Sequence, residues 1–265
     1  MKRPRLTMNL CNLPSWAIAS RGFNENPRPI VIQGVRGAHR QLFLRLDAQE
    51  DPALRGAAFH DYMDVAFQLH QWKGEESELG RRSLRNSYLR FLRGWMFDAN
   101  SMEGAVLKGW VESRFGIPPT FHREPIDDIH SDAYSRYTID RMNGMARTNS
   151  IQAQLDVLYE FTQYELARRN PDSFSFTLFR GVHDFSEHRV LENLSKDRCI
   201  LLLNNLNSFT RDFERAWEFG SRVLEAIVPA QKIFFRADLL PLLRLKGEEE
   251  VIVIGGEYEV RVRTS

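Results

Sequence analysis

The chain has 265 residues, 43% of them apolar and 27% charged, a composition that is typical of a folded globular protein and excludes disordered and collagen-like chains. Its 36 basic and 35 acidic residues give a formal net charge of +1. This balance supplies no sustained positive field, so we expect neither nucleic acid nor an anionic membrane as a partner.

The N-terminal segment starts with a basic Met-Lys-Arg sequence, but Asn9 and Pro14 interrupt the stretch after it. No apolar run in the chain is long enough to span a membrane, so we expect neither a signal peptide nor a membrane span. Cys11 and Cys199 lie far apart and no Cys-x-x-Cys pair occurs, which predicts no disulfide framework and no zinc site. We therefore expect a cytoplasmic protein.

Between residues 36 and 169 apolar side chains recur at helical spacing. Asp51-Pro52 is typical of an N-cap followed by a proline in the first turn, and Gly116 is a typical residue to end a helix. Helices are expected over residues 51–69, 78–97, 101–115 and 149–169. We predict a helical N-terminal region over residues 1–170.

The expected helix over 78–97 is strongly basic, since it carries Arg81, Arg82, Arg85, Arg90 and Arg93. Two interpretations stay open: a solvated face with ion pairs one turn apart, or a docking surface for an acidic partner. Trp95 and Trp110 lie at helical spacing, where aromatic residues are core residues or anchors at an interface.

After Asn170-Pro171 the apolar period changes to two, which indicates strands. We expect strands over residues 174–181, 199–207, 222–228, 248–254 and 258–262. One helix interrupts them, with Thr210 as its N-cap and Gly220 at its end. Helices followed by strands indicate an α+β fold, in which a β-rich region over residues 171–265 forms one compact unit with the helical region.

Several common enzyme signatures are absent from the sequence. No Walker A loop, Gly-x-Gly-x-x-Gly, His-Glu-x-x-His or Gly-x-Ser-x-Gly pattern occurs, so the enzyme classes that depend on them lose support. The histidines are scattered, and the pair His183 and His188 lacks the spacing of zinc ligands on a helix. We interpret both as surface histidines and expect no metal.

An arginine follows an apolar row on one of the expected strands. Period two places Phe174, Phe176 and Leu178 on one face, with Arg180 next on that face and directly before Gly181. A guanidinium group binds a diphosphate through two parallel hydrogen bonds. The alternative interpretation is an edge arginine that is paired with a carboxylate.

A pair of hydroxyl groups ends the next strand. Ser208 and Thr210 share one side of that strand, and Phe209 faces the other side. Hydroxyl groups on one surface can orient a bound ligand. The alternative interpretation is a strand end that leads into a helix cap.

Three consecutive glutamates precede an apolar strand. Alternation puts Glu248 and Glu250 on one face and Glu249 on the other, unless the three form a solvated charge run. An oxocarbenium-like transition state needs a carboxylate near the developing positive charge, and a second carboxylate can serve the incoming nucleophile. Together, the arginine, the hydroxyl groups and the glutamates suit cleavage of a nucleotide–ribose bond.

The order Leu-Phe-Arg-Gly (178–181), Ser-Phe-Thr (208–210) and Glu-Glu-Glu (248–250) resembles the Arg, Ser-x-Ser/Thr and Glu-x-Glu pattern of the arginine-directed mono-ADP-ribosyltransferases. Longer blocks that are similar to the dinitrogenase reductase ADP-ribosyltransferases lie at residues 103–116, 163–169, 204–210 and 246–250. This likeness runs from about Asn12 to Val260.

The resemblance implies a helical layer in front of a small mixed β-sandwich of the ADP-ribosyltransferase type, which binds NAD and holds no metal. It implies transfer of ADP-ribose from NAD to one arginine of dinitrogenase reductase, the nitrogenase iron protein. This modification switches off nitrogen fixation. A PII-type signalling protein is a further implied partner.

The resemblance also implies roles for individual residues. The residues implied to bind NAD are Arg180, Gly181, Ser208 and Thr210. Arg180 would hold the phosphates, and Ser208 would orient the nicotinamide ribose and Glu250. Glu250 would bind the ribose 2′-hydroxyl and stabilise the oxocarbenium, while Glu248 would align the target arginine.

Two other classes of function stay open on the sequence. An NAD glycohydrolase, or a toxin-like transferase with another target, keeps all three short motifs and differs only in the blocks 103–116 and 163–169. A non-catalytic regulator that binds a partner through this fold has no need of both Glu248 and Glu250.

Overall fold

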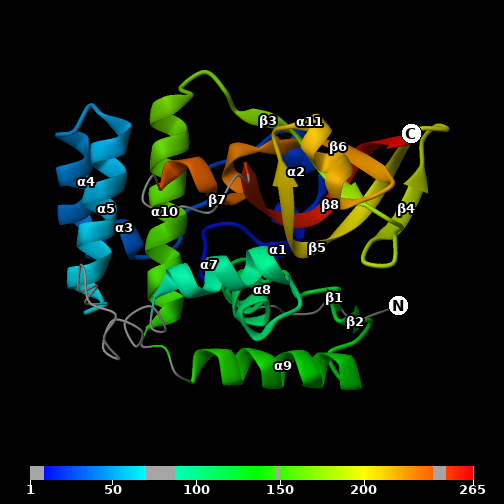
Figure 1. The fold of residues 1–265 in the computed structure, drawn as a ribbon, viewed down its shortest axis with the longest axis horizontal. Coiled ribbons are helices and arrows are strands. Elements are labelled where there is room, and N and C mark those ends of the chain that lie inside the picture. Colours follow the sequence, from blue (N-terminus) through cyan, green and yellow to red (C-terminus); the bar gives the residue numbers. More distant parts are fainter. Residues whose placement is uncertain (1–8, 70–86, 147, 149, 241–248, 265) are drawn as a thin grey trace.

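The computed structural model describes residues 9–69, 87–146, 148, 150–240 and 249–264, with a helical N-terminal region beside a β-rich C-terminal region (Figure 1). The helices of the N-terminal region are α1 (Ser15–Ala19), α2 (Arg21–Glu25), α3 (Val35–Ala38), α4 (Arg40–Asp47), α5 (Pro52–Ala66), α7 (Tyr88–Phe97), α8 (Met102–Phe115), α9 (Asp132–Met145) and α10 (Ile151–Arg169). A short hairpin of β1 (Phe121–His122) and β2 (Glu124–Pro125) lies between α8 and α9. The α+β class predicted from the sequence is confirmed.

The boundaries of the predicted helices follow their capping residues. The Asp51 side chain accepts a hydrogen bond from the Ala53 N–H at 2.8 Å, so the predicted N-cap of α5 is confirmed. Gly116 ends α8 with φ +67°, a left-handed conformation that favours glycine. The helix expected over 78–97 corresponds to α7 from Tyr88 onward, and its first part lies outside the described residues.

The helix α9 has no clear signal in the sequence. Its only buried residues are Ala133, Tyr137 and Gly144, two of which are small. The apolar stripe that identifies an amphipathic helix is therefore too thin in this segment to be seen in the sequence.

The described strands of the C-terminal region form a six-stranded sheet in the order β4-β5-β3-β6-β8-β7. They are β3 (Ser175–Val182), β4 (Arg189–Asn193), β5 (Arg198–Thr210), β6 (Arg222–Pro229), β7 (Ile233–Arg236) and β8 (Glu250–Thr264). Because β5 also pairs with β8, the strands β5, β3, β6 and β8 close a ring, and the sheet folds around its own core. All described pairings are antiparallel, so the expectation of a mixed sheet is wrong. The described connections between these strands lack the long helical crossovers that parallel pairs need.

The two strands expected over 248–254 and 258–262 are one continuous strand, β8. Gly255 and Gly256 do not turn the chain but let it pass close to other backbone. A Cβ at Gly255 would lie 1.6 Å from the Asn204 backbone oxygen, and Gly256 has φ +114°. In the sequence, the same two glycines indicate a break between strands.

Thr210 is the last residue of β5 and not the N-cap of the following helix, so that prediction is wrong. The cap is Asp212, whose carboxylate accepts hydrogen bonds from the N–H groups of Glu214 and Arg215. The helix α11 (Phe213–Ala216) continues into a 3-10 turn that ends before Gly220, as predicted.

One hydrophobic core joins the two regions. Besides side chains from α5, α8 and α10, it contains Leu206, Phe234 and Ile254 from the sheet. A second core, which includes Leu178 and Phe209, fills the inside of the folded sheet. The division of the chain at residue 170 and its description as one compact unit both stay predictions.

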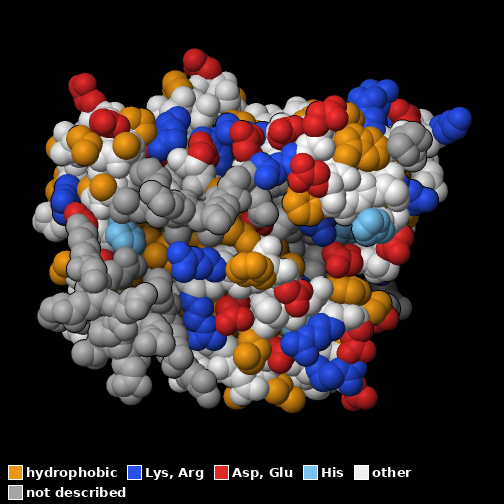
Figure 2. All heavy atoms as spheres, viewed as in Figure 1, with side chains coloured by type: hydrophobic (Ala, Val, Ile, Leu, Met, Phe, Trp, Pro, Cys, Tyr) orange, Lys and Arg blue, Asp and Glu red, His pale blue; other side chains and the backbone are white. Residues whose placement is uncertain are grey.

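The surface agrees with the balanced charge of the chain. Acidic and basic side chains are interspersed over the face in Figure 2. Within the described ranges, no helix has the length and apolar character needed to cross a membrane. Among the same residues, no group of three or more His, Cys, Asp or Glu side chains is arranged to hold a metal ion.

Candidate active site

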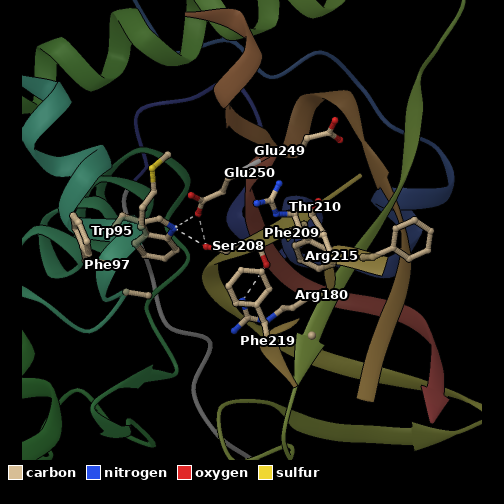
Figure 3. A pocket seen from close by; sticks show the side chains of 14 residues that line it. Trp95, Phe97, Arg180, Ser208, Phe209, Thr210, Arg215, Phe219, Glu249 and Glu250 are labelled. Carbon is tan, nitrogen blue, oxygen red and sulfur yellow. Dashed lines mark hydrogen bonds between the residues drawn. The ribbon is translucent and has the colours of Figure 1, made fainter. Parts of the chain in front are cut away.

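A pocket of about 280 Å³ lies where α7 faces the strands β3, β5 and β8 (Figure 3). The predicted site residues that line it are Arg180, Gly181, Ser208, Thr210 and Glu250. Strand pairing brings the three motifs together, because Thr210 lies opposite both Phe179 of β3 and Glu250 of β8. Residues of all three short motifs therefore meet in one pocket.

Glu250 lies in the wall of the pocket and is only 6% exposed. Its Oε1 accepts a hydrogen bond from Ser208 Oγ at 2.6 Å and one from Trp95 Nε1 at 3.1 Å. Trp95 Nε1 also lies 2.8 Å from Ser208 Oγ, so the three groups form a closed triangle (Figure 3). Hydrogen bonds of this kind stabilise a carboxylate in its charged form and hold its position.

Trp95 is a site residue that the sequence did not reveal. Its helical spacing indicates a core or interface residue, and with 2% exposure it is indeed buried. However, Figure 3 shows its ring nitrogen directed at Ser208 and Glu250 across the pocket. Nothing in the local sequence distinguishes this tryptophan from Trp110, which packs in the core.

The Arg180 side chain, which comes from β3, is largely buried, with 18% of its surface exposed. Its Nη1 donates to the Ser208 backbone oxygen at 3.0 Å, and its Nη2 donates to Glu187 Oε2 at 3.0 Å. Burial lowers the pKa of Arg180, an effect that Glu187 opposes, and a guanidinium stays protonated in either case. The pairing of Arg180 with a carboxylate is therefore observed, while diphosphate binding by Arg180, which also lines the pocket, stays a prediction.

Gly181 and Thr210 shape the pocket next to Arg180. A Cβ at Gly181 would lie 2.0 Å from the Ala216 backbone oxygen, so only glycine lets α11 lie this close to β3. Thr210 is 7% exposed, and its Oγ1 accepts a hydrogen bond from the Asp212 N–H at 3.1 Å. The Thr210 hydroxyl thus supports the turn into α11.

Of the three consecutive glutamates, the structure describes Glu249 and Glu250. Glu248 lies outside the described residues. Figure 3 shows Glu249 and Glu250 pointing in opposite directions. The Glu249 carboxylate is half exposed and lies 3.7 Å from Arg211 Nε. This opposition of neighbouring side chains agrees with the alternation that the sequence predicts.

Arg215 is a second cationic residue in the pocket wall. Its Nε is buried and has no hydrogen-bond partner among the described residues. The sequence offers no reason to select it, because an arginine within a short helix is usually solvated.

Arg90 of the basic helix and His188 differ from what their sequence patterns suggest. In the basic helix, Arg90 donates to Glu103 Oε1 of α8 at 2.8 Å, so its ion pair joins two helices and is not the pair one turn apart that the sequence suggested. Arg81, Arg82 and Arg85 lie outside the described residues. The interpretation of His188 as a surface histidine is wrong, because the side chain is folded inward and is 6% exposed.

Replacing Trp95 by Phe is expected to lower the turnover of this site about tenfold while ligand affinity changes little. The phenyl ring keeps most of the buried area, but Ser208 Oγ and Glu250 Oε1 each lose a donor, and a hydrogen bond to a charged group is worth about 1.5–3 kcal/mol. Steady-state kinetics with the substrate proposed below, together with calorimetric binding, would separate the two quantities. An unchanged turnover number would remove Trp95 from the site.

Comparisons with known proteins identify relatives of the chain. Residues 8–262 match the protein family described as dinitrogenase reductase ADP-ribosyltransferase. A Rhodospirillum rubrum protein named NAD(+)--dinitrogen-reductase ADP-D-ribosyltransferase is 45% identical over 257 residues, which cover 96% of this chain and 93% of that protein. No solved structure matches the chain.

Proposed function

The chain belongs to the dinitrogenase reductase ADP-ribosyltransferase family, and we propose that it moves ADP-ribose from NAD to one arginine of dinitrogenase reductase, which switches off nitrogen fixation. It is accordingly an enzyme, and NAD is its co-substrate. The observation that supports this function most directly is the buried triangle of Glu250, Ser208 and Trp95 beside the cationic Arg180.

The first chemical step breaks the bond between the nicotinamide nitrogen and C1′ of the ribose. Nicotinamide leaves with the bonding electron pair and becomes neutral, so positive charge develops on the ribose. The role that we propose for Glu250 is to stabilise this charge, because a fixed carboxylate in a water-poor site favours a cation strongly. The hydrogen bond from Ser208 keeps the Glu250 carboxylate in place while the charge develops.

In the second step a guanidinium nitrogen of the target arginine forms a bond to C1′ and loses a proton. We propose that Glu248 aligns the guanidinium group and accepts this proton, since a protonated guanidinium is a poor nucleophile. The support for this role comes from the sequence, in which Glu248 precedes Glu250 by two residues, the spacing at which residues of an extended strand share a face.

We propose that Arg180 binds the diphosphate of NAD, with Gly181 and Thr210 in the adjoining wall. Arg180→Lys is therefore expected to weaken NAD binding about tenfold, because an ammonium group cannot form the two parallel hydrogen bonds of a guanidinium. Titration calorimetry with NAD measures the change. An affinity equal to that of the unmodified enzyme would assign Arg180 to the ion pair with Glu187 alone.

The overall function can be tested with purified proteins. NAD labelled in its adenylate part is incubated with the enzyme and dinitrogenase reductase, and the labelled residue is then identified by mass spectrometry. A labelled arginine on dinitrogenase reductase is the expected result. Release of nicotinamide without any labelled protein would instead indicate an NAD glycohydrolase.

Two further proposals concern partner and compartment. We propose regulation by a PII-type signalling protein, which the family resemblance supports, and a measurable test is the change in transfer rate when a purified PII-type protein is added. We also propose a cytoplasmic location, which is supported by two cysteines that are both free.

A further inference from the structure

The helix α7 carries two exposed side chains that take no part in the chemistry described above. Arg93 and Phe97 lie four residues apart, which places them one turn from each other on the same face of the helix. We call them the outer pair of α7. On the face drawn in Figure 2, basic and hydrophobic side chains lie side by side over this helix.

Both members of the outer pair are open to solvent. Phe97 is 92% exposed, more than any other large hydrophobic side chain among the described residues. Arg93 is also exposed and forms no ion pair within the described ranges, whereas Arg90 of the same helix is paired with Glu103. The outer pair therefore offers an apolar surface and a positive charge next to each other.

The outer pair lies beside the entrance of the pocket that holds Glu250. Phe97 lines this pocket, as does Phe219 of the 3-10 turn after α11, which is 52% exposed. Figure 3 shows Phe97 on the α7 side of the pocket and Phe219 on the side of the strands. The rim of the entrance thus carries exposed aromatic surface, while a carboxylate lies in its wall.

Helix geometry separates Phe97 from the reaction centre. Two positions along an α-helix correspond to a rotation of about 200°, so Trp95 and Phe97 leave α7 in nearly opposite directions. Trp95 is 2% exposed and donates to Glu250, whereas Phe97 faces solvent and contributes only to the rim. The helix therefore presents one aromatic residue to the site and another to a molecule that approaches from solution.

The reaction proposed above brings a protein surface to this entrance. When the guanidinium of the target arginine lies beside Glu250, the surface that surrounds this arginine must touch the rim. Single exposed hydrophobic residues are common and need no partner, but aromatic and arginine side chains are enriched where proteins bind each other. The position of the outer pair at the rim favours the protein substrate as its partner.

We propose that the outer pair of α7 docks the surface of dinitrogenase reductase around the target arginine. Phe97 packs against an apolar side chain of that surface, and Arg93 pairs with a carboxylate beside it. Such a contact favours one arginine over the many others that a guanidinium site alone could accept. The proposal rests on the function proposed above, since it names the surface through which the same site receives its protein substrate.

The first test compares transfer with hydrolysis. Phe97→Ala is expected to raise the KM for dinitrogenase reductase about tenfold, because burial of a phenyl ring against the partner is lost. The Kd for NAD and the rate of NAD hydrolysis by water should stay unchanged, since neither involves the protein substrate. Trp16→Ala is the matched control, because this aromatic side chain is 76% exposed on α1 and does not line the pocket.

Charge reversal tests the second member of the pair. Arg93→Glu is expected to raise the KM for dinitrogenase reductase about tenfold at low ionic strength and less at high salt, because salt screens exposed charges. Arg40→Glu, at an exposed position of α4, is the matched control and should leave this KM unchanged. A KM that stays normal in both Phe97→Ala and Arg93→Glu overturns the proposal. An equal loss of hydrolysis and transfer also overturns it, because the outer pair would then act on the reaction itself.

A cross-link identifies the partner directly. An enzyme that carries a benzophenone-bearing phenylalanine analogue in place of Phe97 is illuminated with dinitrogenase reductase and NAD, and mass spectrometry locates the link. A link to dinitrogenase reductase beside the target arginine is expected, and the same analogue in place of Trp16 should give none. Links only between copies of the enzyme, or to a surface remote from that arginine, overturn the proposal.

The outcomes separate this proposal from the proposed function. If the unmodified enzyme labels dinitrogenase reductase and Phe97→Ala and Arg93→Glu do so with the same KM, the function stands and the docking surface fails. If position 97 is linked to dinitrogenase reductase but no arginine is labelled by the unmodified enzyme, the docking surface stands and the function fails.

Discussion

Glu250→Gln is expected to lower both the transfer of ADP-ribose to arginine and the slower hydrolysis of NAD by water about a hundredfold or more. The amide keeps the shape of the side chain and can still accept a hydrogen bond from Ser208, but it has no negative charge. Both reactions pass through the same positively charged ribose, so both lose the same stabilisation. The measurement is nicotinamide release with and without dinitrogenase reductase.

The affinity for NAD supplies the control for this variant. Because ground-state NAD carries little of the charge that Glu250 stabilises, the Kd of the variant should stay within a few-fold of the unmodified enzyme. Hydrolysis that continues at the normal rate would contradict the proposed role of Glu250.

Glu248→Gln is expected to abolish transfer to arginine while it leaves the hydrolysis of NAD nearly intact. A glutamine can neither hold a guanidinium ion by charge nor accept its proton. Hydrolysis by a water molecule depends less on either interaction. The two rates are read from the same assay of nicotinamide release, with protein labelling as the measure of transfer. A parallel loss of both reactions would make Glu248 part of the oxocarbenium site instead.

Glu249→Gln is the matched control for both variants. Its carboxylate points away from Glu250 and lies near Arg211 at the rim of the pocket. We expect both rates to change only a few-fold. If Glu249→Gln were as damaging as Glu250→Gln, the assignment of faces on this strand would be wrong, and the catalytic roles would fail with it.

The parts of the fold that could be predicted have local signals in the sequence. Asp51 and Gly116 mark helix ends through capping chemistry, and the change of apolar period after residue 170 marks the start of the sheet. The continuous β8 could not be predicted, because Gly255 serves a close approach to Asn204 from a distant part of the chain. The antiparallel pairing and the closed ring depend on contacts between distant strands, which no local pattern encodes.

The same distinction applies to the candidate site. Period two determines which side chains share a face of one strand, and the chemistry of the residues together with the family resemblance grouped Arg180, Ser208 and Glu250, which line one pocket. Trp95 could not be grouped with them, because its position depends on how α7 packs against the sheet. A tryptophan on a buried helix face is usually a core residue, and only the three-dimensional packing distinguishes Trp95 from such a residue.

Because Trp95 lies outside the three short motifs, we expect that these motifs alone cannot carry the activity into another protein. A fragment of residues 171–265, or a chimera with another helical region, would retain the arginine, hydroxyl and glutamate motifs but lose the indole donor to Glu250. Misplacement of a catalytic group by about 1 Å can cost roughly a hundredfold in rate. The Glu250 carboxylate is therefore held in part by α7, and we expect that a protein bound to the outer surface of this helix changes the reaction rate without entering the pocket.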